Sequence, residues 1–287
     1  MRRGGGKPAF DICPLARARI RRSSAVMSEI RQSRLPFAPW ADARTRRLPG
    51  ILPIPMEEWL EVDDAYGAQM AERERLIASC PEAVLALAPE AQAAADELYA
   101  MVLDLLPALG FVPVAGGLRR PDGVEVALDP DAPLATLGRL VQEDLCLMRE
   151  GPDGHVLAGA VLCFPAGWML AEKFGRPMMG IHRPVAKYTE DVGARVQRLM
   201  DGVQPGRVLM RGTAHHSNAA LHNPRREAQG RAPEGDLPFI RVERQGLVRL
   251  PETRYVSFSI HTYVVEPAAL SPEQAALLAE FPIREAA

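Results

Sequence analysis

The sequence has few of the motifs by which cofactor and metal sites are usually recognised. Only four of its 287 residues are cysteines, and they stand far apart with no CxxC pair: Cys13, Cys80, Cys146 and Cys163. This spacing argues against a zinc ribbon or a cysteine-ligated iron–sulfur cluster within the chain. Cys146 and Cys163 lie in apolar, strand-like runs, which predicts that they are small, reduced core residues.

Loops that bind nucleotides are missing as well. Neither the glycines at 4–6 nor those at 116–117 have the spacing of a dinucleotide or phosphate loop, so the chain is not expected to bind NAD or flavin itself. A GxSxG elbow is absent, which argues against a serine hydrolase. The histidines show no HExxH spacing, and the adjacent His215 and His216 would point apart, so a zinc site is not expected.

Charge and hydropathy argue against two further classes of partner. The net charge is -2 and the pI is about 6.3, without the excess of Lys and Arg that nucleic-acid phosphates require. The longest apolar stretches, Val156–Phe164 and Val256–Val265, are too short or too interrupted to span a bilayer. With reduced cysteines, these features predict a cytoplasmic protein that binds neither nucleic acid nor membrane.

The first 34 residues differ in composition from the rest of the chain. They carry nine Lys or Arg residues against two acids, Asp11 and Glu29. An Arg-rich, acid-poor start can be a targeting peptide, but no apolar core for secretion is present. We interpret residues 1–34 as a basic disordered extension, or as sequence upstream of a true start at Met27. Residues 35–280 are then expected to form a single domain.

Helical patterns follow a Pro-rich arm over residues 35–62. One amphipathic helix is expected over 63–78, and Pro89 opens a second that ends at Gly110. From Leu145 onward the pattern changes to strands. The expected elements there are a hairpin (145–149 and 155–164), a short helix (168–174), a helix capped by Thr189 (190–200), a strand (207–213), a loop (214–238) and a second hairpin (240–250 and 254–266). This order predicts an α+β fold with an antiparallel sheet of about five strands and helices segregated to one side.

One histidine stands out within the run from Val161 to Tyr188. His182 follows an apolar bed that includes Met179, and it precedes the cations Arg183 and Lys187, with Arg195 as a further candidate. A neutral imidazole in an apolar pocket with cations at its rim is what a haem iron and its propionates require. The alternative is a loop histidine near the surface whose hydrogen bonds are satisfied by its neighbours.

A second group of polar residues lies on the last hairpin. Alternation along the strand puts Arg241, Glu243 and Gln245 on one face, where we expect His261 and Tyr263 of the partner strand to join them. Such a face could bind a small cation through Glu243 and move protons through Tyr263 or His261. The alternative is a solvated sheet face with cross-strand pairs.

Six segments, in order along the chain, resemble a known family. They are PF-x-PW (36–40), WLEVDD-x-Y (59–66), LGRLVQEDLCLM (137–148), LCFP-x-x-W with Lys173 and Gly175, IHRPV with Tyr188, and RVERQ-x-L-x-RLP (241–251). Together these segments resemble the haem-dependent oxidative N-demethylase alpha-subunit family over about residues 35–265. Two departures occur where a pocket wall is expected. Gly212, Thr213, Ala214 and His215 follow Arg211 where the family has Asn-Trp, and His261 replaces an Arg.

The resemblance implies a PAS-like haem b domain that uses dioxygen to remove a methyl group from a small, dimethylamine-like secondary amine. Electrons would arrive from NADPH through FMN and an iron–sulfur cluster on partner reductase subunits. We predict His182 as the proximal iron ligand, because an apolar bed precedes it, Pro184 stiffens the chain after it and it lies in the IHRPV motif. His222, between Leu221 and Pro224, is the runner-up and His261 is third.

The implied haem contacts are Arg183, Met179, Lys187 and Arg211. The implied catalytic residues are Glu243, Tyr263 and His261. Two alternatives remain: a non-catalytic haem-binding sensor or carrier with a PAS-like core, and a scaffold that kept the fold without haem.

Overall fold

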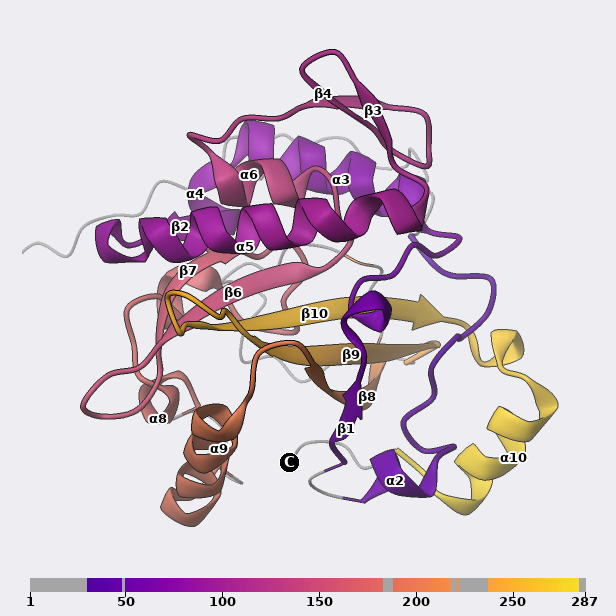
Figure 1. Ribbon diagram of the computed structural model, residues 1–287. Helices are drawn as coiled ribbons and strands as arrows, with labels where there is room; N and C mark the ends of the chain where they lie inside the picture. The colour runs from indigo at the N-terminus through magenta and orange to yellow at the C-terminus, as the bar shows by residue number, and fades with distance from the viewer. Residues whose placement is uncertain (1–29, 48–49, 183–187, 218–220, 222–236, 284–287) are drawn as a thin grey trace, which may run out of the picture.

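The computed structural model describes residues 30–47, 50–182, 188–217, 221 and 237–283. Most strands belong to one antiparallel sheet of seven, in the order β1-β8-β9-β10-β6-β7-β2 (Figure 1). Its strands are β1 (Leu52–Ile54), β2 (Leu85–Leu87), β6 (Asp144–Arg149), β7 (Val156–Val161), β8 (Val208–Ser217), β9 (Phe239–Arg249) and β10 (Val256–Val265). A separate three-stranded sheet contains β3 (Val112–Val114), β4 (Gly117–Arg119) and β5 (Glu125–Ala127).

The described α-helices are α2 (Ala43–Arg46), α3 (Tyr66–Ser79), α4 (Pro81–Val84), α5 (Gln92–Leu105), α6 (Pro133–Gly138), α7 (Leu170–Lys173), α8 (Met178–Ile181), α9 (Glu190–Gly202) and α10 (Pro272–Glu280). Three of them, α3, α5 and α9, have 13 or 14 residues each, and the others are shorter. The two predicted N-terminal helices are confirmed as α3 and α5, and the predicted cap of α9 is confirmed because Thr189 Oγ1 accepts from the Val192 amide at 3.4 Å. Within the described ranges, no helix combines the length and the apolar character that crossing a membrane requires.

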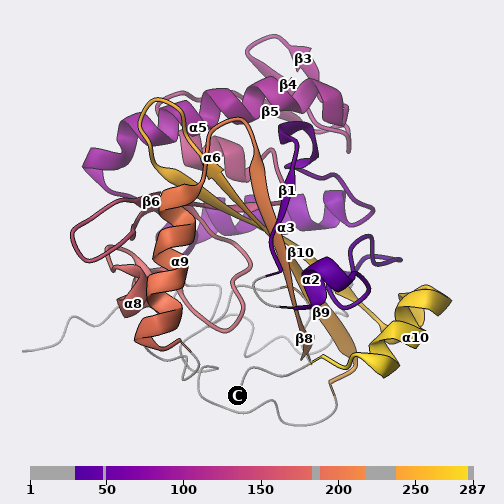
Figure 2. The same cartoon turned by 60° about the horizontal axis from the view of Figure 1, so that its bottom comes forward.

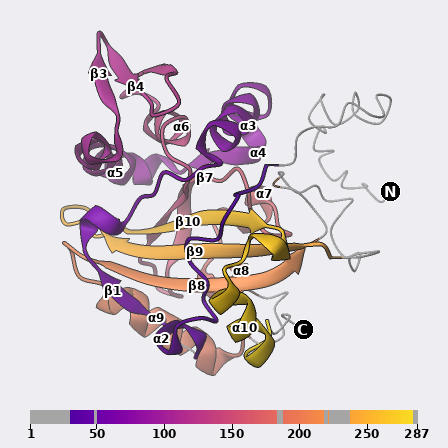
Figure 3. The same ribbon diagram turned by 90° about the vertical axis from the view of Figure 1, so that its right-hand side faces the viewer.

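Helices cover both faces of the large sheet, so the expected segregation to one side is wrong (Figures 1 and 3). Leu145 and Leu147 of β6 pack into the core formed with α3, α5 and α6. Cys146 of the same strand packs on the other face, with Ile181 of α8 and Met200 of α9. Because consecutive β6 side chains are apolar and point to opposite faces, both faces need a cover. We call the two sides the α3 face and the α9 face.

The sheet is also larger than the sequence predicts. β1 and β2 have three residues each, too few to show a periodic pattern, and β8 continues to Ser217 into what was expected to be a loop. The α+β class is nevertheless confirmed.

The N-terminal arm packs against the strands from residue 30 onward, earlier than expected. Gln32 is buried, and its backbone amide donates to the Val264 carbonyl at 3.0 Å. Further along the arm, the Phe37 ring lies against Gly212 of β8, where any Cβ would overlap it. Gly212 therefore makes room for the PF-x-PW segment. Residues 1–29 lie outside the described part of the chain.

Candidate functional site

Strand register separates the residues that the sequence placed together. In the β9–β10 pair, Glu243 lies opposite Thr262, whereas Arg244 lies opposite His261. Residues directly opposite each other in an antiparallel pair point to the same face. Glu243 therefore faces the α9 side, while His261 and Tyr263 face the α3 side. The expectation of one shared catalytic face is wrong, because the turn that joins the strands sets this register.

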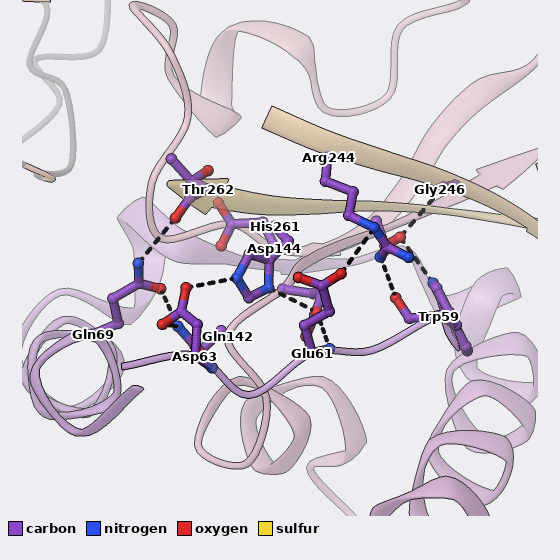
Figure 4. Close-up of polar contacts among 12 residues, drawn as sticks. Trp59, Glu61, Asp63, Gln69, Gln142, Asp144, Arg244, Gly246, His261 and Thr262 are labelled. Atoms are coloured by element: carbon purple, nitrogen blue, oxygen red, sulfur yellow. Dashed lines mark hydrogen bonds and ion pairs between the residues drawn. The ribbon is translucent and has the colours of Figure 1, made fainter. Parts of the chain in front are cut away.

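His261 lies at the centre of a buried network on the α3 face (Figure 4). Its Nδ1 lies 2.9 Å from Glu143 Oε1, and its Nε2 lies 3.1 Å from Asp63 Oδ2. Burial by itself lowers the pKa of His261, but the hydrogen bonds to Asp63 and Glu143 outweigh it and raise the pKa to about 10. The ring is therefore an imidazolium that donates from both nitrogens. With no lone pair left, His261 is not available as an iron ligand.

The rest of this network ties the arm to the sheet. The Tyr263 hydroxyl donates to Glu61, and Glu61 also accepts from Arg244 Nε at 3.0 Å. Gln32 and Gln142 each donate to the Asp63 carboxylate at 2.8 Å. These side chains come largely from the WLEVDD and LGRLVQED segments. Two of the segments that carry the family resemblance therefore build a buried structural network.

His182 lies on the α9 side, directly after α8. Its Nδ1 is 3.0 Å from the Met178 carbonyl oxygen. Because a carbonyl only accepts, Nδ1 carries the proton and the lone pair of the neutral ring is on Nε2. Burial lowers the pKa of His182, and the positive charges of Lys173 and Arg211 lower it further. The hydrogen bond to the Met178 carbonyl raises this pKa but does not outweigh them. The ring is therefore neutral, and a backbone carbonyl fixes its tautomer.

Two cations accompany His182. Lys173, at the end of α7, lies over the Trp168 ring with Nζ 4.1 Å from its centroid. Arg211, on β8, is paired in register with Gln245. Burial lowers the pKa of both cations, while the charge of Glu243 acts in the opposite direction. His182, Lys173, Arg211 and Glu243 therefore converge on one region of the α9 face. Figure 2 shows α8 and α9 side by side on this side of the molecule.

Two buried donors in this region have no acceptor among the described residues. They are Nε of Arg211 and the hydroxyl of Tyr188. The Tyr188 ring stacks on His182, with the ring centroids 4.2 Å apart and the planes 14° apart. A buried donor without a partner is costly, so donors of this kind are expected where a ligand supplies the acceptor.

Glu243 is held by its neighbours on β9. Its Oε1 accepts from Arg241 Nη2 at 3.0 Å, and its Oε2 accepts from Gln245 Nε2 at 2.9 Å. The residue is 8% exposed. Arg241 also donates to the Phe164 carbonyl oxygen, which anchors the pair to the chain after β7. The carboxylate is thus oriented, but both of its oxygens already accept hydrogen bonds.

The other predicted contacts divide into three groups. Met179 is 40% exposed, and its sulfur packs against Gly193 of α9. Arg195 forms an exposed ion pair with Asp191 of the same helix at 2.7 Å. Arg183, Lys187 and His222 lie outside the described residues. Lys173 and Tyr188 were part of the quoted segments, but no role was assigned to them, because only folding brings them to His182.

Comparison with known protein families shows to which family the chain belongs. The chain matches the family described as haem-dependent oxidative N-demethylase, alpha subunit-like, over residues 50–281. It belongs to this family. The predicted resemblance is confirmed, and the family description implies haem.

The convergent region of this N-demethylase-like chain fits that group. His182 offers a neutral nitrogen for iron, and Lys173 and Arg211 offer charge for propionates. The donors on Arg211 and Tyr188 that lack an acceptor within the described chain agree with such a ligand.

Proposed function

We propose that this protein is a haem-dependent oxidative N-demethylase that acts on a small secondary amine. One observation carries the proposal: in a member of this family, the neutral His182 presents Nε2 beside the half-buried cations Lys173 and Arg211. Arg211 Nε has no acceptor within the described part of the chain. We place haem b on the α9 face of the sheet, in a PAS-like arrangement.

The chain's own residues would bind the haem iron and pair with the haem propionates. His182 would bind iron through Nε2, with its tautomer maintained by the Met178 carbonyl. Arg211 and Lys173 would meet the propionates, and Arg183 and Lys187 remain predicted further cations. When bound, haem supplies dioxygen activation and oxidation of the N-methyl group, and the protein supplies binding and orientation.

Glu243 is the proposed partner of the substrate ammonium. A carboxylate has about four lone-pair sites, so the bonds from Arg241 and Gln245 leave acceptor capacity on Glu243. Those two bonds also fix the direction of the carboxylate. Demethylation would release formaldehyde, and electrons would come from NADPH through FMN and an iron–sulfur cluster on partner subunits.

The test compares histidine variants of the full chain purified with adequate haem supply. His182→Ala should remove the Soret band or leave weakly held, spectrally altered haem. His222→Ala, the matched control for the runner-up ligand, should keep the wild-type spectrum. A His182→Ala protein with the wild-type Soret band and full haem occupancy would overturn the assignment.

A non-catalytic haem-binding sensor or carrier is the second candidate, and one observation favours it. Both oxygens of Glu243 already accept hydrogen bonds from Arg241 and Gln245, so the carboxylate has less charge to offer an amine. Formaldehyde assays with dimethylamine, dioxygen and a supplied reductant separate the two functions. An enzyme forms formaldehyde in proportion to the amine consumed, whereas a sensor or carrier takes up dioxygen and forms none.

A further inference from the structure

Among the described residues, one hydrogen bond holds the edge of the His182 ring. The bond from Nδ1 to the Met178 carbonyl oxygen, 3.0 Å long, selects the tautomer and restrains one corner of the imidazole. Its partner lies only four residues earlier, in the same short helix. This bond alone leaves the ring free to tilt about the N–H···O line, so the plane of the ring must be set by what lies against its face.

Tyr188 lies against that face. The two rings are nearly parallel, with centroids 4.2 Å apart and an interplanar angle of 14°. Tyr188 directly precedes Thr189, the N-cap of α9, so its backbone leads into α9, whereas His182 is the C-cap of α8. The stack therefore restrains the imidazole from α9, independently of α8.

The contact between α8 and α9 supports the position of Tyr188. Gly193, one turn into α9, has no side chain, and a Cβ there would lie 3.4 Å from Tyr188 Cε1 and would overlap the Met179 sulfur. The glycine thus lets Met179 of α8 lie close to α9. Tyr188 consequently lies between the first turn of α9 and the histidine.

We propose that Tyr188 is a positioning residue that sets the plane of the His182 imidazole, and that it does so through ring stacking rather than through its hydroxyl. The ring makes the contact with His182. The hydroxyl donates to none of the described residues, so it is left for a ligand and does not hold the imidazole. The inference rests on the proposed function because it concerns His182 as the iron ligand. The orientation of a ligating imidazole influences both its bond to the metal and the retention of that metal.

Two variants of the full chain separate the ring from the hydroxyl. Tyr188→Phe keeps an aromatic ring, and Tyr188→Leu removes it while keeping an apolar side chain. In the haem-loaded proteins, Tyr188→Leu should shift the iron–imidazole stretching frequency and weaken haem binding about 10–100-fold, the usual effect of losing an outer-shell partner. Tyr188→Phe should keep the wild-type frequency.

A measurement on haem-free protein tests the stack directly. The His182 ring protons should show an upfield ring-current shift in the NMR spectra of the wild type and Tyr188→Phe, and should lose it in Tyr188→Leu. If His182→Ala retained haem normally, His182 would not be the iron ligand. The ring-current shifts would still test whether Tyr188 stacks on His182.

Three results overturn the inference. One is a wild-type stretching frequency in Tyr188→Leu. Another is an equal change in Tyr188→Phe and Tyr188→Leu, which would assign the role to the hydroxyl. The third is the absence of the upfield shift in the wild type, a measurement that does not depend on whether any variant folds.

Discussion

The imidazolium of His261 should contribute several kcal/mol to folding stability. The residue is 1% exposed, with a carboxylate on each ring nitrogen, from Asp63 and Glu143. The rise of its pKa from the ordinary 6.5 to about 10 corresponds to about 5 kcal/mol at most, since a tenfold change in proton affinity is worth about 1.4 kcal/mol. Breaking a buried ion pair typically costs about 3–5 kcal/mol, which agrees. Replacing His261 with an uncharged residue should therefore remove a large part of the total stability.

Urea unfolding of two variants measures this contribution. His261→Gln removes the charge at similar size and should lose about 3–5 kcal/mol at pH 7. His261→Arg keeps a cation between Asp63 and Glu143 and should lose less.

The pH dependence has a definite sign. Because the folded-state pKa of His261 is raised, the stabilisation is complete below about pH 6.5 and is lost as pH rises toward 10. The difference in unfolding free energy between wild type and His261→Gln should shrink by about 1.4 kcal/mol per pH unit across that window. A difference that is absent at pH 7, or that stays constant between pH 7 and 9.5, would refute the buried imidazolium.

Three further predictions concern the site and the arm. Arg211→Gln should weaken haem retention by roughly tenfold or more, because a charge-assisted contact is worth about 1.5–3 kcal/mol. The control Arg195→Gln, which changes an exposed ion pair, should leave haem retention unchanged. Equal haem loss from both variants would contradict the role of Arg211. Glu243→Gln should raise the apparent amine dissociation constant by about tenfold or more without altering the haem spectrum, and unchanged amine binding would rule Glu243 out. Gly212→Val should cost about 1–3 kcal/mol in thermal unfolding by displacing the Phe37 ring; an unchanged melting temperature would show that the arm does not need this glycine.

Local patterns in the sequence were sufficient to predict several elements. The apolar stripe of α5, the Thr189 cap of α9 and the alternating hairpin of β9 and β10 depend on residues close together in the chain, so periodicity and capping chemistry indicate them. The family resemblance likewise follows from linear segments. The shortest strands, β1 to β5, were missed because three residues carry no period.

The composition of the site was decided by tertiary structure. Each strand of the last hairpin displays two faces, and its sequence does not say which face of one strand joins which face of the next; a shift of one residue would have put His261 beside Glu243. The observed register places Glu243 on the α9 face, with Arg211 and Lys173. It places His261 on the α3 face, with Asp63 and Glu143. Lys173, Tyr188 and Arg211 come from separate segments, and only packing brings them to His182. The sequence by itself determined the longer elements and the family, and it singled out His182 as a candidate, whereas pairing and packing determined which charges surround this histidine, because both depend on contacts between residues far apart in the chain.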